Sequence, residues 1–515
     1  MRPRFPGSTP QGARAPSRAR AGPSEPPRAR PAGRRPLHPS RARLAVLALA
    51  GTLGACAAVG PNYERPAVET PPAWTVEAPW RTIAPADAAP KGDWWLRFGD
   101  PQLDALQRQA AAGNQTLALA AARLEQARAI VRVADAGLLP SATVQARTGR
   151  ARISANRPLT SYNGTNFAVV QDDNAVGLAV AWELDIAGRI RRAIESAEAS
   201  AEQSAADFGN AQLLVQTDLA TAYFNLRATD IELDALARSI ALQRRALDFV
   251  GTRRELGAAS GFELSQQQAL LDTTLTQAEV LRRQRGPYEH AIATLTGTPA
   301  PRFALGVDTR IPAAPAIPIG IPSDVLERRP DVASAERAMA AANAQIGVAT
   351  AAWYPSIVLN PSAGFQSRAL ESLVGAPSLV WSLGAQLATP LFSAGRIRGN
   401  VDVARAAYDA TVATYRRTVL VAMQEVEDGI TSIAALERAN ERSRTAVDSA
   451  RRVLDLATAR YEGGATTFLD VITAQQTVLT AERLDAQVAG QRAIASVFLV
   501  KALGGDYGPP GLAAR

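Results

Sequence analysis

The sequence is poor in the side chains that most enzyme active sites use. Its 515 residues include one cysteine and two histidines, and only 5% are aromatic. One cysteine cannot form an internal disulfide. Only His290 lies beyond residue 43, so that part of one chain cannot build a histidine-based triad or a multi-histidine metal site. Since a P-loop and a nucleophile elbow are also missing, we predict a protein that is not an enzyme and needs no cofactor.

Most of the chain also lacks an excess of charge of one sign. The net charge is +8, but residues 1–43 alone hold 11 arginines and one acid. The remaining residues carry 45 basic and 47 acidic side chains, a net charge of −2. Because nucleic-acid binding needs a dense set of cations along the phosphates, we expect no nucleic-acid partner.

A run long enough to form a transmembrane helix is missing from the start of the chain. The apolar stretch 44–53 has ten residues, whereas a spanning helix needs about 20. Basic residues precede it and the small pair Gly54-Ala55 follows it, the pattern of an export signal. Cys56 comes next, which resembles the lipobox of bacterial lipoproteins, where this cysteine is lipidated and becomes the mature N-terminus. The alternative is a reactive or buried cysteine.

What the chain does contain is one long unit present twice, 207 residues apart. The five residues Ala187–Arg191 return unchanged as Ala394–Arg398. One inserted residue would rotate all later side chains of a helix by about 100°, so the constant spacing indicates a helical unit of fixed length. Two copies predict an architecture built by repetition. Further pairs at this spacing are Leu247/Leu454, Asp248/Asp455, Arg253/Arg460, Gly257/Gly464, Ala258/Ala465, Glu263/Asp470 and Gln268/Gln475.

Each copy is predicted to contain a very long helix. After Gly188 and Gly395 the helical pattern continues for nearly 70 residues, about 100 Å. Leucine or isoleucine recurs at every seventh position from Leu219 to Leu247, which favours coiled-coil packing. Shorter helical segments flank each long helix. They are expected at 101–137 and 266–285 in the first copy, and at 323–352 and 475–491 in the second.

Between the opening and the long helix of each copy, apolar residues alternate with polar or small ones, as in β-strands. We predict one hairpin per copy, with strands of about ten residues, a length that suits a tilted bilayer crossing. Four strands leave two open edges, which hydrocarbon does not tolerate. Small membrane barrels need about eight strands, so a membrane location predicts three chains sharing twelve strands. The alternative is a soluble α+β protein whose hairpins pack on its own helices.

Several short motifs, in order along the chain, resemble one protein family. They are Cys56–Tyr63 with Arg65-Pro66, Trp94-Trp95 with Phe98–Leu103, Glu327–Val332 and Val500–Gly505. Together they are similar to the outer-membrane efflux lipoproteins of the TolC/OprM type, NodT branch, over residues 53–505. The resemblance implies a mostly α fold with membrane β: a trimeric, 12-stranded outer-membrane β-barrel continued by a long periplasmic α-helical barrel of coiled-coil hairpins.

The resemblance also implies a function and partners. The trimer would be the passive exit duct of a tripartite efflux pump in the outer membrane of a Gram-negative cell. A periplasmic membrane-fusion adaptor and an inner-membrane pump of the resistance-nodulation-division (RND) type would pass drugs or other solutes to it. Lipid on Cys56 would add an anchor. One alternative is the duct of a type I protein secretion system, and another is a non-conducting lipoprotein coiled-coil envelope scaffold.

Two places at the hairpin ends receive roles from the resemblance. Tyr461 and Asp470 lie where the family has its periplasmic gate, and Gly257-Ala258 and Gly464-Ala465 where hairpin tips meet the adaptor. Three copies of Asp470 would form an acidic ring that favours cations. The family often has a second acid where this chain has Thr473, so weaker selectivity is expected. The alternative for Asp470 is an exposed or helix-capping side chain, and from the residues alone the glycines simply end helices.

These features divide the chain into six expected parts. They are a basic extension and lipoprotein signal peptide at 1–55, an extended lipidated arm at 56–92, the first outer-membrane efflux repeat at 93–302, a proline-rich linker at 303–322, the second repeat at 323–505 and a tail at 506–515.

Overall fold

The computed structural model describes residues 58–66, 92–156, 168–312 and 328–505. All of them belong to one compact unit, Ala55–Arg515. Cys56, the expected lipidation site, and most of the expected arm lie outside the described residues. The statements below concern the described residues.

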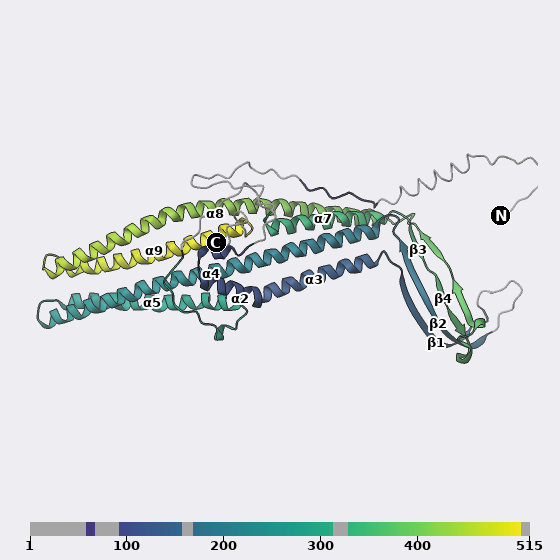
Figure 1. Cartoon of the computed structure of the whole chain (residues 1–515), viewed down its shortest axis with the longest axis horizontal. Coiled ribbons are helices and arrows are strands. Elements are labelled where there is room, and N and C mark those ends of the chain that lie inside the picture. The colour runs from purple at the N-terminus through teal and green to yellow at the C-terminus, as the bar shows by residue number, and fades with distance from the viewer. Residues whose placement is uncertain (1–57, 67–91, 157–167, 313–327, 506–515) are drawn as a thin grey trace, which may run out of the picture. The chain divides into compact units, whose positions relative to one another are not determined.

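Two long helices dominate the structure (Figure 1). Helix α4 covers Arg189–Glu255 and α8 covers Arg396–Glu462, and each has 67 residues. Both start after a glycine in the left-handed region, with φ of 77° at Gly188 and 83° at Gly395. The prediction of a helix of nearly 70 residues in each copy is therefore confirmed.

Each long helix turns into a shorter one that packs back along it. These return helices are α5, Gly261–Leu295, and α9, Phe468–Ala502, with 35 residues each. The sequence placed their ends about ten residues too early, at residues 285 and 491. In the first copy the predicted end directly precedes Gly286-Pro287, a pair that α5 contains. Burial continues beyond those points, since Ile292 and Leu499 are fully buried.

The opening helical segment of the first copy is broken, contrary to the prediction of one helix over 101–137. It forms α2, Pro101–Gly113, and α3, Gln115–Ala136. The break is at Asn114, whose side chain accepts hydrogen bonds from the backbone N–H groups of Thr116 and Leu117 at 2.8 and 3.1 Å. Its amide also donates to the Leu295 carbonyl at 2.8 Å. The second copy has one described helix here, α7, Pro330–Ala351.

The strands form a sheet that is four strand positions wide. Its members are β1, Ser141–Ile153; β2, Val169–Leu184; β3, Ser356–Leu359; β4, Ser362–Ser367; β5, Leu379–Ser382; and β6, Ala385–Ala388. All pairings are antiparallel: β1 with β2, β2 with both β3 and β4, β4 with β5, and β3 with β6. The predicted hairpins are therefore present and joined side by side. Within one described chain, β1 lies at one edge and β5 and β6 at the other.

Strand lengths differ from the expected ten residues. The first-copy strands have 13 and 16 residues, and each second-copy strand is interrupted. One break falls at Pro361, which has no N–H to donate to a neighbouring strand. Its carbonyl still accepts from Val180 N at 2.9 Å, and Asn360 N donates to the Gly384 carbonyl at 2.9 Å. These bonds keep the two parts of each interrupted strand in register.

Side chains from both copies form the main apolar core. It lies around α4, where Leu219, Phe224 and Leu226 are fully buried. The short 3-10 helix η2, Trp94–Phe98, packs its aromatic rings there, and Phe98 and Phe224 have ring centroids 4.9 Å apart. The other 3-10 helices are η3, Ala300–Arg302; η4, Leu370–Ser372; and η5, Ala376–Ser378.

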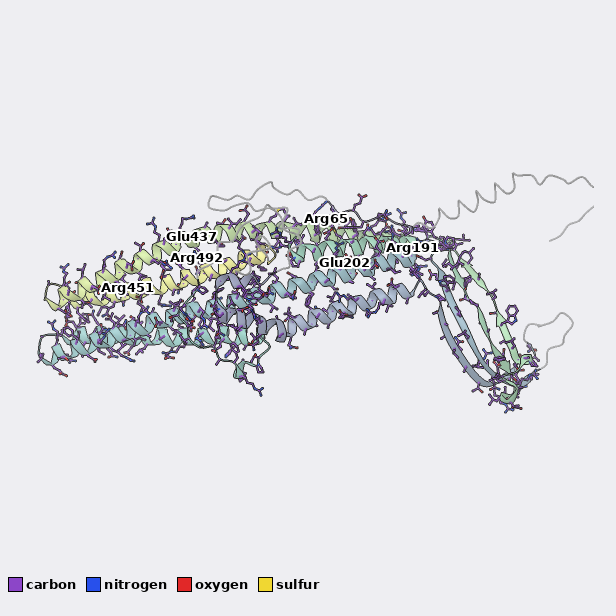
Figure 2. The ribbon with its side chains drawn as sticks, in the orientation of Figure 1. Arg65, Arg191, Glu202, Glu437, Arg451 and Arg492 are labelled. Carbon is purple, nitrogen blue, oxygen red and sulfur yellow. The ribbon has the colours of Figure 1, made fainter. Side chains whose placement is uncertain are left out.

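Ion pairs between helices add to this packing, and Figure 2 labels four of the residues that form them: Glu202, Glu437, Arg451 and Arg492. Glu202 of α4 pairs with Arg337 of α7 at 3.1 Å, which connects the two copies. Arg451 of α8 pairs with Glu482 of α9 at 2.5 Å. No helix among the described residues is both long enough and apolar enough to cross a membrane.

The segment 58–66 is bound across the two copies. Arg192 of α4 is 4% exposed and donates to the carbonyl oxygens of Val59 and Gly60 at 3.1 and 3.2 Å. Asn343 of α7 donates to the carbonyl of Pro61 at 3.0 Å. The segment therefore joins the start of α4, next to the sheet, to α7 of the second copy.

Candidate functional site at the hairpin tips

The two α-hairpin tips have the same backbone geometry. Gly257 and Gly464 adopt left-handed φ values of 77° and 70°. The next residue donates its N–H five residues back, Ala258 to Arg253 and Ala465 to Arg460, at 2.7 Å and 2.8 Å. This pattern is a Schellman turn, which satisfies the last carbonyls of a helix. The predicted tip residues Gly257, Ala258, Gly464 and Ala465 are all exposed, so they are accessible to a partner.

Glycine is required at only one of two neighbouring positions in the second tip. Gly464 has left-handed φ, whereas the preceding Gly463 has φ −78° and its repeat equivalent is Leu256. We expect Gly464→Ala to destabilise the turn by about 1–2 kcal/mol, while Gly463→Ala changes it little. Hydrogen exchange of the amides around residues 460–470 measures the difference. Equal protection in the two variants would contradict the turn assignment.

Each return helix begins with a capping box. Ser260 and Glu263 cap α5, and Thr467 and Asp470 cap α9, with the side chains bonding to each other's backbone N–H. Asp470 is exposed and also accepts a short hydrogen bond from the Thr466 hydroxyl. That bond is the main cause that lowers the pKa of Asp470, with further contributions from Thr467 and Arg460. Asp470 is therefore a helix cap whose carboxylate stays ionised at neutral pH.

Tyr461 is buried in a cluster that connects the two tips. Its ring lies 5.1 Å from that of Phe468 and 6.4 Å from that of Phe249 on α4, measured between centroids. The guanidinium carbon of Arg253 lies 5.1 Å from the Tyr461 centroid and 5.8 Å from the Phe249 centroid. We call Phe249, Arg253, Tyr461 and Phe468 the tip latch. It links α4 of the first copy to α8 and α9 of the second.

The charges around Tyr461 also come from the first tip. Burial raises the pKa of Tyr461, the carboxylate of Glu263 raises it further, and the guanidinium of Arg253 lowers it. Glu263 and Arg253 are thus close enough to act on a residue of the second tip. Of the two predicted gate residues, Tyr461 packs between the tips, whereas Asp470 faces solvent.

Sequence reasoning missed two members of the latch as functional candidates, Phe249 and Phe468, and treated Arg253 only as a repeat landmark. The positions at which the two copies carry different residues contained a signal. At the 207-residue spacing, Phe249 corresponds to Leu456, Tyr461 to Arg254 and Phe468 to Gly261. Each aromatic residue occurs in one copy only, because the two tips contact each other with unlike surfaces.

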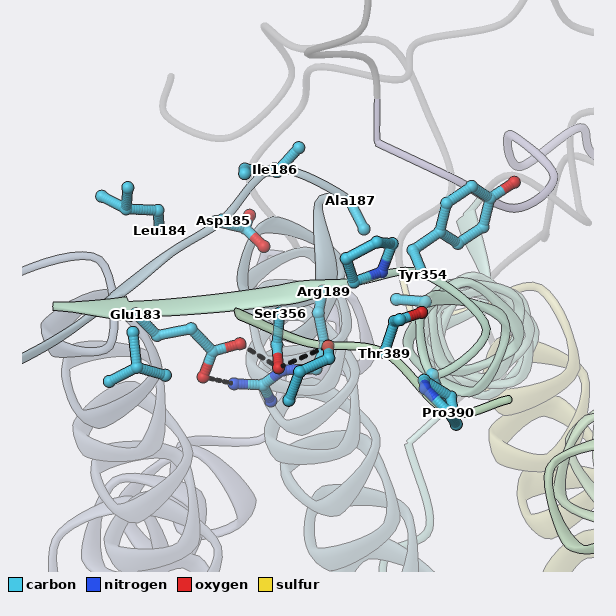
Figure 3. A pocket seen from close by; sticks show the side chains of 15 residues that line it. Glu183, Leu184, Asp185, Ile186, Ala187, Arg189, Tyr354, Ser356, Thr389 and Pro390 are labelled. Atoms are coloured by element: carbon cyan, nitrogen blue, oxygen red, sulfur yellow. Dashed lines mark hydrogen bonds and ion pairs between the residues drawn. The ribbon is translucent and has the colours of Figure 1, made fainter. Parts of the chain in front are cut away.

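A cavity lies away from the tips, where the sheet meets the helices (Figure 3). This cavity of about 560 Å³ is lined by residues from the β2–α4 and α7–β3 junctions and from the end of β6. Glu183 and Arg189 form a two-bond ion pair at 3.0 and 2.7 Å beside it. Asp185 accepts from the backbone N–H groups of Ile190 and Arg191 at 2.9 and 3.0 Å. These bonds fix the direction in which α4 leaves the sheet.

The described residues contain no group of three or more His, Cys, Asp or Glu side chains able to hold a metal ion. His290 is exposed on α5. The chemistry of the tips is therefore that of turns, caps and aromatic contacts.

Comparison with known proteins identifies the family. The family model described as "Outer membrane efflux protein" matches residues 106–298 and 321–505. The toluene efflux pump outer membrane protein TtgF of Pseudomonas putida is 30% identical over 468 residues, 90% of this chain and 96% of that protein. The pyoverdine export outer membrane protein OpmQ of Pseudomonas aeruginosa is 32% identical over 434 residues, 83% and 90% of the two chains.

Similar solved structures are outer-membrane channels as well. The outer-membrane channel OprN superposes with a TM-score of 0.79 at 29% identity, over 87% of this chain and 99% of that one. The open state of the Neisseria gonorrhoeae MtrE outer membrane channel gives a TM-score of 0.75 at 27% identity, over 87% and 98%. The predicted TolC-like fold and outer-membrane location are confirmed. The chain belongs to the outer membrane efflux protein family and is an outer-membrane efflux channel of the TolC/OprM type.

Proposed function

We propose that three copies of this chain form the gated, passive exit duct of a tripartite efflux pump. The observation that carries this proposal is the sheet, which has two edge positions without partners among the described residues of one chain. Unpaired backbone groups are not stable in hydrocarbon, so each β1 edge needs the β5–β6 edge of another copy. Three copies supply twelve strand positions, enough to close a barrel.

Exposed apolar side chains support the same assembly. Val133 of α3 is 74% exposed, and Trp381 and Leu387 of the sheet are 73% and 65% exposed. Exposed apolar side chains of this size are typical of a protein or lipid interface. In the trimer the strand residues face lipid and the helix residues face the next copy.

The acidic ring at the tip is the proposed cation filter, and Asp470→Asn tests it. Asparagine keeps an acceptor for the α9 cap but removes the charge, so the cation preference of the channel is expected to fall toward unity with the closed state intact. Reversal potentials in salt gradients across planar bilayers measure it. Glu263→Gln, the same capping position in the other tip, is the control. If the cation preference fell equally in both variants, the assignment of Asp470 as the selective residue of the gate would be wrong.

The exposed tip turns are the proposed docking points for a periplasmic membrane-fusion adaptor. The Gly257-Ala258 and Gly464-Ala465 turns present small residues on rigid helix ends, which lets another helical hairpin approach closely. Energy for transport would come from an inner-membrane RND pump. The names of relatives include toluene efflux and pyoverdine export, so we propose small organic molecules, rather than proteins, as cargo.

Lipid on Cys56 is the proposed second attachment to the outer membrane. The described chain resumes at Ala58, and Val59 N donates to the Ala187 carbonyl at 3.1 Å, at the junction of β2 and α4. Arg192 holds the same segment, so a lipid two residues before Ala58 would lie close to the ends of the strands.

Cys56→Ser is expected to abolish incorporation of labelled palmitate, because the serine hydroxyl is not the acceptor of lipoprotein acylation. Metabolic labelling followed by immunoprecipitation measures it, with the wild-type chain as the positive control. Label retained by the serine variant would refute the lipid assignment.

Conductance tests the proposed duct as a whole. Purified protein added to planar bilayers is expected to give discrete, long-lived conductance steps. A non-conducting envelope scaffold gives none, and a protein-secretion duct would complement loss of a secretion system rather than loss of drug resistance.

A further inference from the structure

Three glutamines are buried inside the periplasmic helices. Gln243 of α4 and Gln267 of α5 are 0% exposed, and Gln475 of α9 is 3% exposed. Glutamine is mostly found at protein surfaces, so three in one region of a helix bundle are unusual. We call them the glutamine layer.

On α4 and α9, Gln243 and Gln475 lie between two apolar clusters, a shaft cluster and a tip cluster. On α5, Gln267 lies within the tip cluster, between Leu264 and Leu270. On α4, Gln243 is between Ile240 of the shaft cluster and Val250 of the tip cluster. On α9, Gln475 is between Ile472 of the tip cluster and Leu479 of the shaft cluster. The buried members of the shaft cluster are Leu236, Ile240, Leu271, Ala278, Leu281 and Leu479. Those of the tip cluster are Val250, Leu270, Tyr461, Phe468, Val471 and Ile472.

The amide groups of this layer are only half satisfied by the protein. Gln267 Nε2 donates to the backbone carbonyl of Gln243 at 2.9 Å, and Gln243 Nε2 donates to Ser239 Oγ at 3.0 Å. The Oε1 atoms of Gln243, Gln267 and Gln475 accept no hydrogen bond from the part of the chain that the structure describes. A buried acceptor without a donor is unfavourable, and buried water is the usual donor in such places.

The contacts between the copies differ on the two sides of the layer. Toward the shaft cluster, α4 and α9 are joined by two ion pairs, Arg238–Glu482 at 3.1 Å and Glu232–Arg483 at 3.2 Å. Toward the tips, the described contacts between the copies are apolar packing and the tip latch. The two copies are therefore joined more firmly on the shaft side of the layer than on the tip side.

We propose that the glutamine layer binds buried water and is the hinge about which the tips open. This inference rests on the gated duct proposed above. Water exchanges hydrogen-bond partners readily, so helices can rotate at a hydrated layer without breaking close apolar packing. The shaft cluster then stays fixed while the tip cluster moves with its latch. Polar core layers in coiled coils similarly reduce stability in return for specificity.

The triple variant Gln243→Met, Gln267→Met and Gln475→Met tests the hinge, because methionine has the same length but no amide. We expect a Tm at least about 2 °C higher, slower hydrogen exchange around residues 472–479, and a tenfold or greater fall in the frequency of channel opening. The matched control is Gln268→Met with Gln476→Met, at exposed neighbouring positions, and it should change none of these.

Each result decides the proposal. A lower or unchanged Tm, or opening at the wild-type frequency, would overturn it. Should the triple variant fail to fold, Gln475→Met alone provides the same measurements with a smaller expected shift. If the wild-type protein itself does not conduct, the proposed duct fails, while Tm and hydrogen exchange still test the hydrated layer.

Discussion

Replacing Asp230 with alanine is expected to destabilise the protein by about 3–5 kcal/mol, the usual effect of removing one partner of a buried ion pair. Asp230 is fully buried. Its carboxylate accepts from Arg227 at 2.9 Å and from Arg285 at 2.7 Å, and from the backbone N–H of Asp308 at 3.2 Å. Without it, the buried Arg227 loses its acidic partner, and the partly buried Arg285 keeps only Glu289, at 2.9 Å.

Asp230, Arg227 and Arg285, which we call the Asp230 node, also hold the segment that leaves the first copy. Arg227 and Arg285 each donate to a carbonyl there, of Gly306 and Leu305, both at 2.7 Å. Loss of Asp230 should therefore also expose residues 303–308 to protease. Denaturant unfolding of the detergent-solubilised protein and limited proteolysis measure the two effects.

Asp234→Ala is the matched control for Asp230. Asp234 lies one turn further along α4 and pairs with Arg238 at the surface, where such pairs contribute about 0–1 kcal/mol. If both substitutions lowered the free energy of unfolding equally, the burial of the Asp230 node would be contradicted.

Removing the Arg253 side chain is expected to open the channel. The guanidinium stacks on Phe249 and Tyr461, and each such contact contributes about 0.5–1 kcal/mol at a partly exposed site. If opening separates α4 from α8, Arg253→Ala loses the Tyr461 contact in the closed state only, because Phe249 lies on the same helix as Arg253 and stays beside it in both states. The ratio of open to closed channels should rise by about two- to fivefold. Single-channel recordings at fixed voltage measure this ratio.

The repeat provides the control for the latch. Arg460 is the equivalent of Arg253 at the 207-residue spacing, but it is exposed. Arg460→Ala should leave the open-to-closed ratio near its wild-type value. Equal opening of both variants would show that basic charge at the tips, rather than the stacking of Arg253, holds them closed.

Local patterns predicted the elements whose formation depends on neighbours in sequence. The glycines at 188 and 395 and the unbroken spacing between copies located α4 and α8 closely. The break at Asn114 was missed because it depends on the Leu295 carbonyl, 181 residues away. The interruption at Pro361 was readable, since proline cannot donate in a strand, but the alternation of apolar residues on both sides concealed it.

The candidate site was likewise only partly predictable from local sequence. The turns at Gly257 and Gly464 follow from glycine's access to left-handed φ. Asp470 and Tyr461 came from the family resemblance, and the structure places one at the surface and the other in the latch. Phe249, Asp230 and the glutamine layer depend on which helices pack together. Heptad spacing indicates that a helix has a partner but does not specify which helix it is.

The stoichiometry of the purified channel tests the central claim most directly. The mature chain, extracted from outer membranes in mild detergent, is to be measured by light scattering with the detergent mass subtracted. Because one sheet leaves both its edges unpaired, the account predicts a single species of three polypeptides. A monomer that stays soluble without detergent would contradict it.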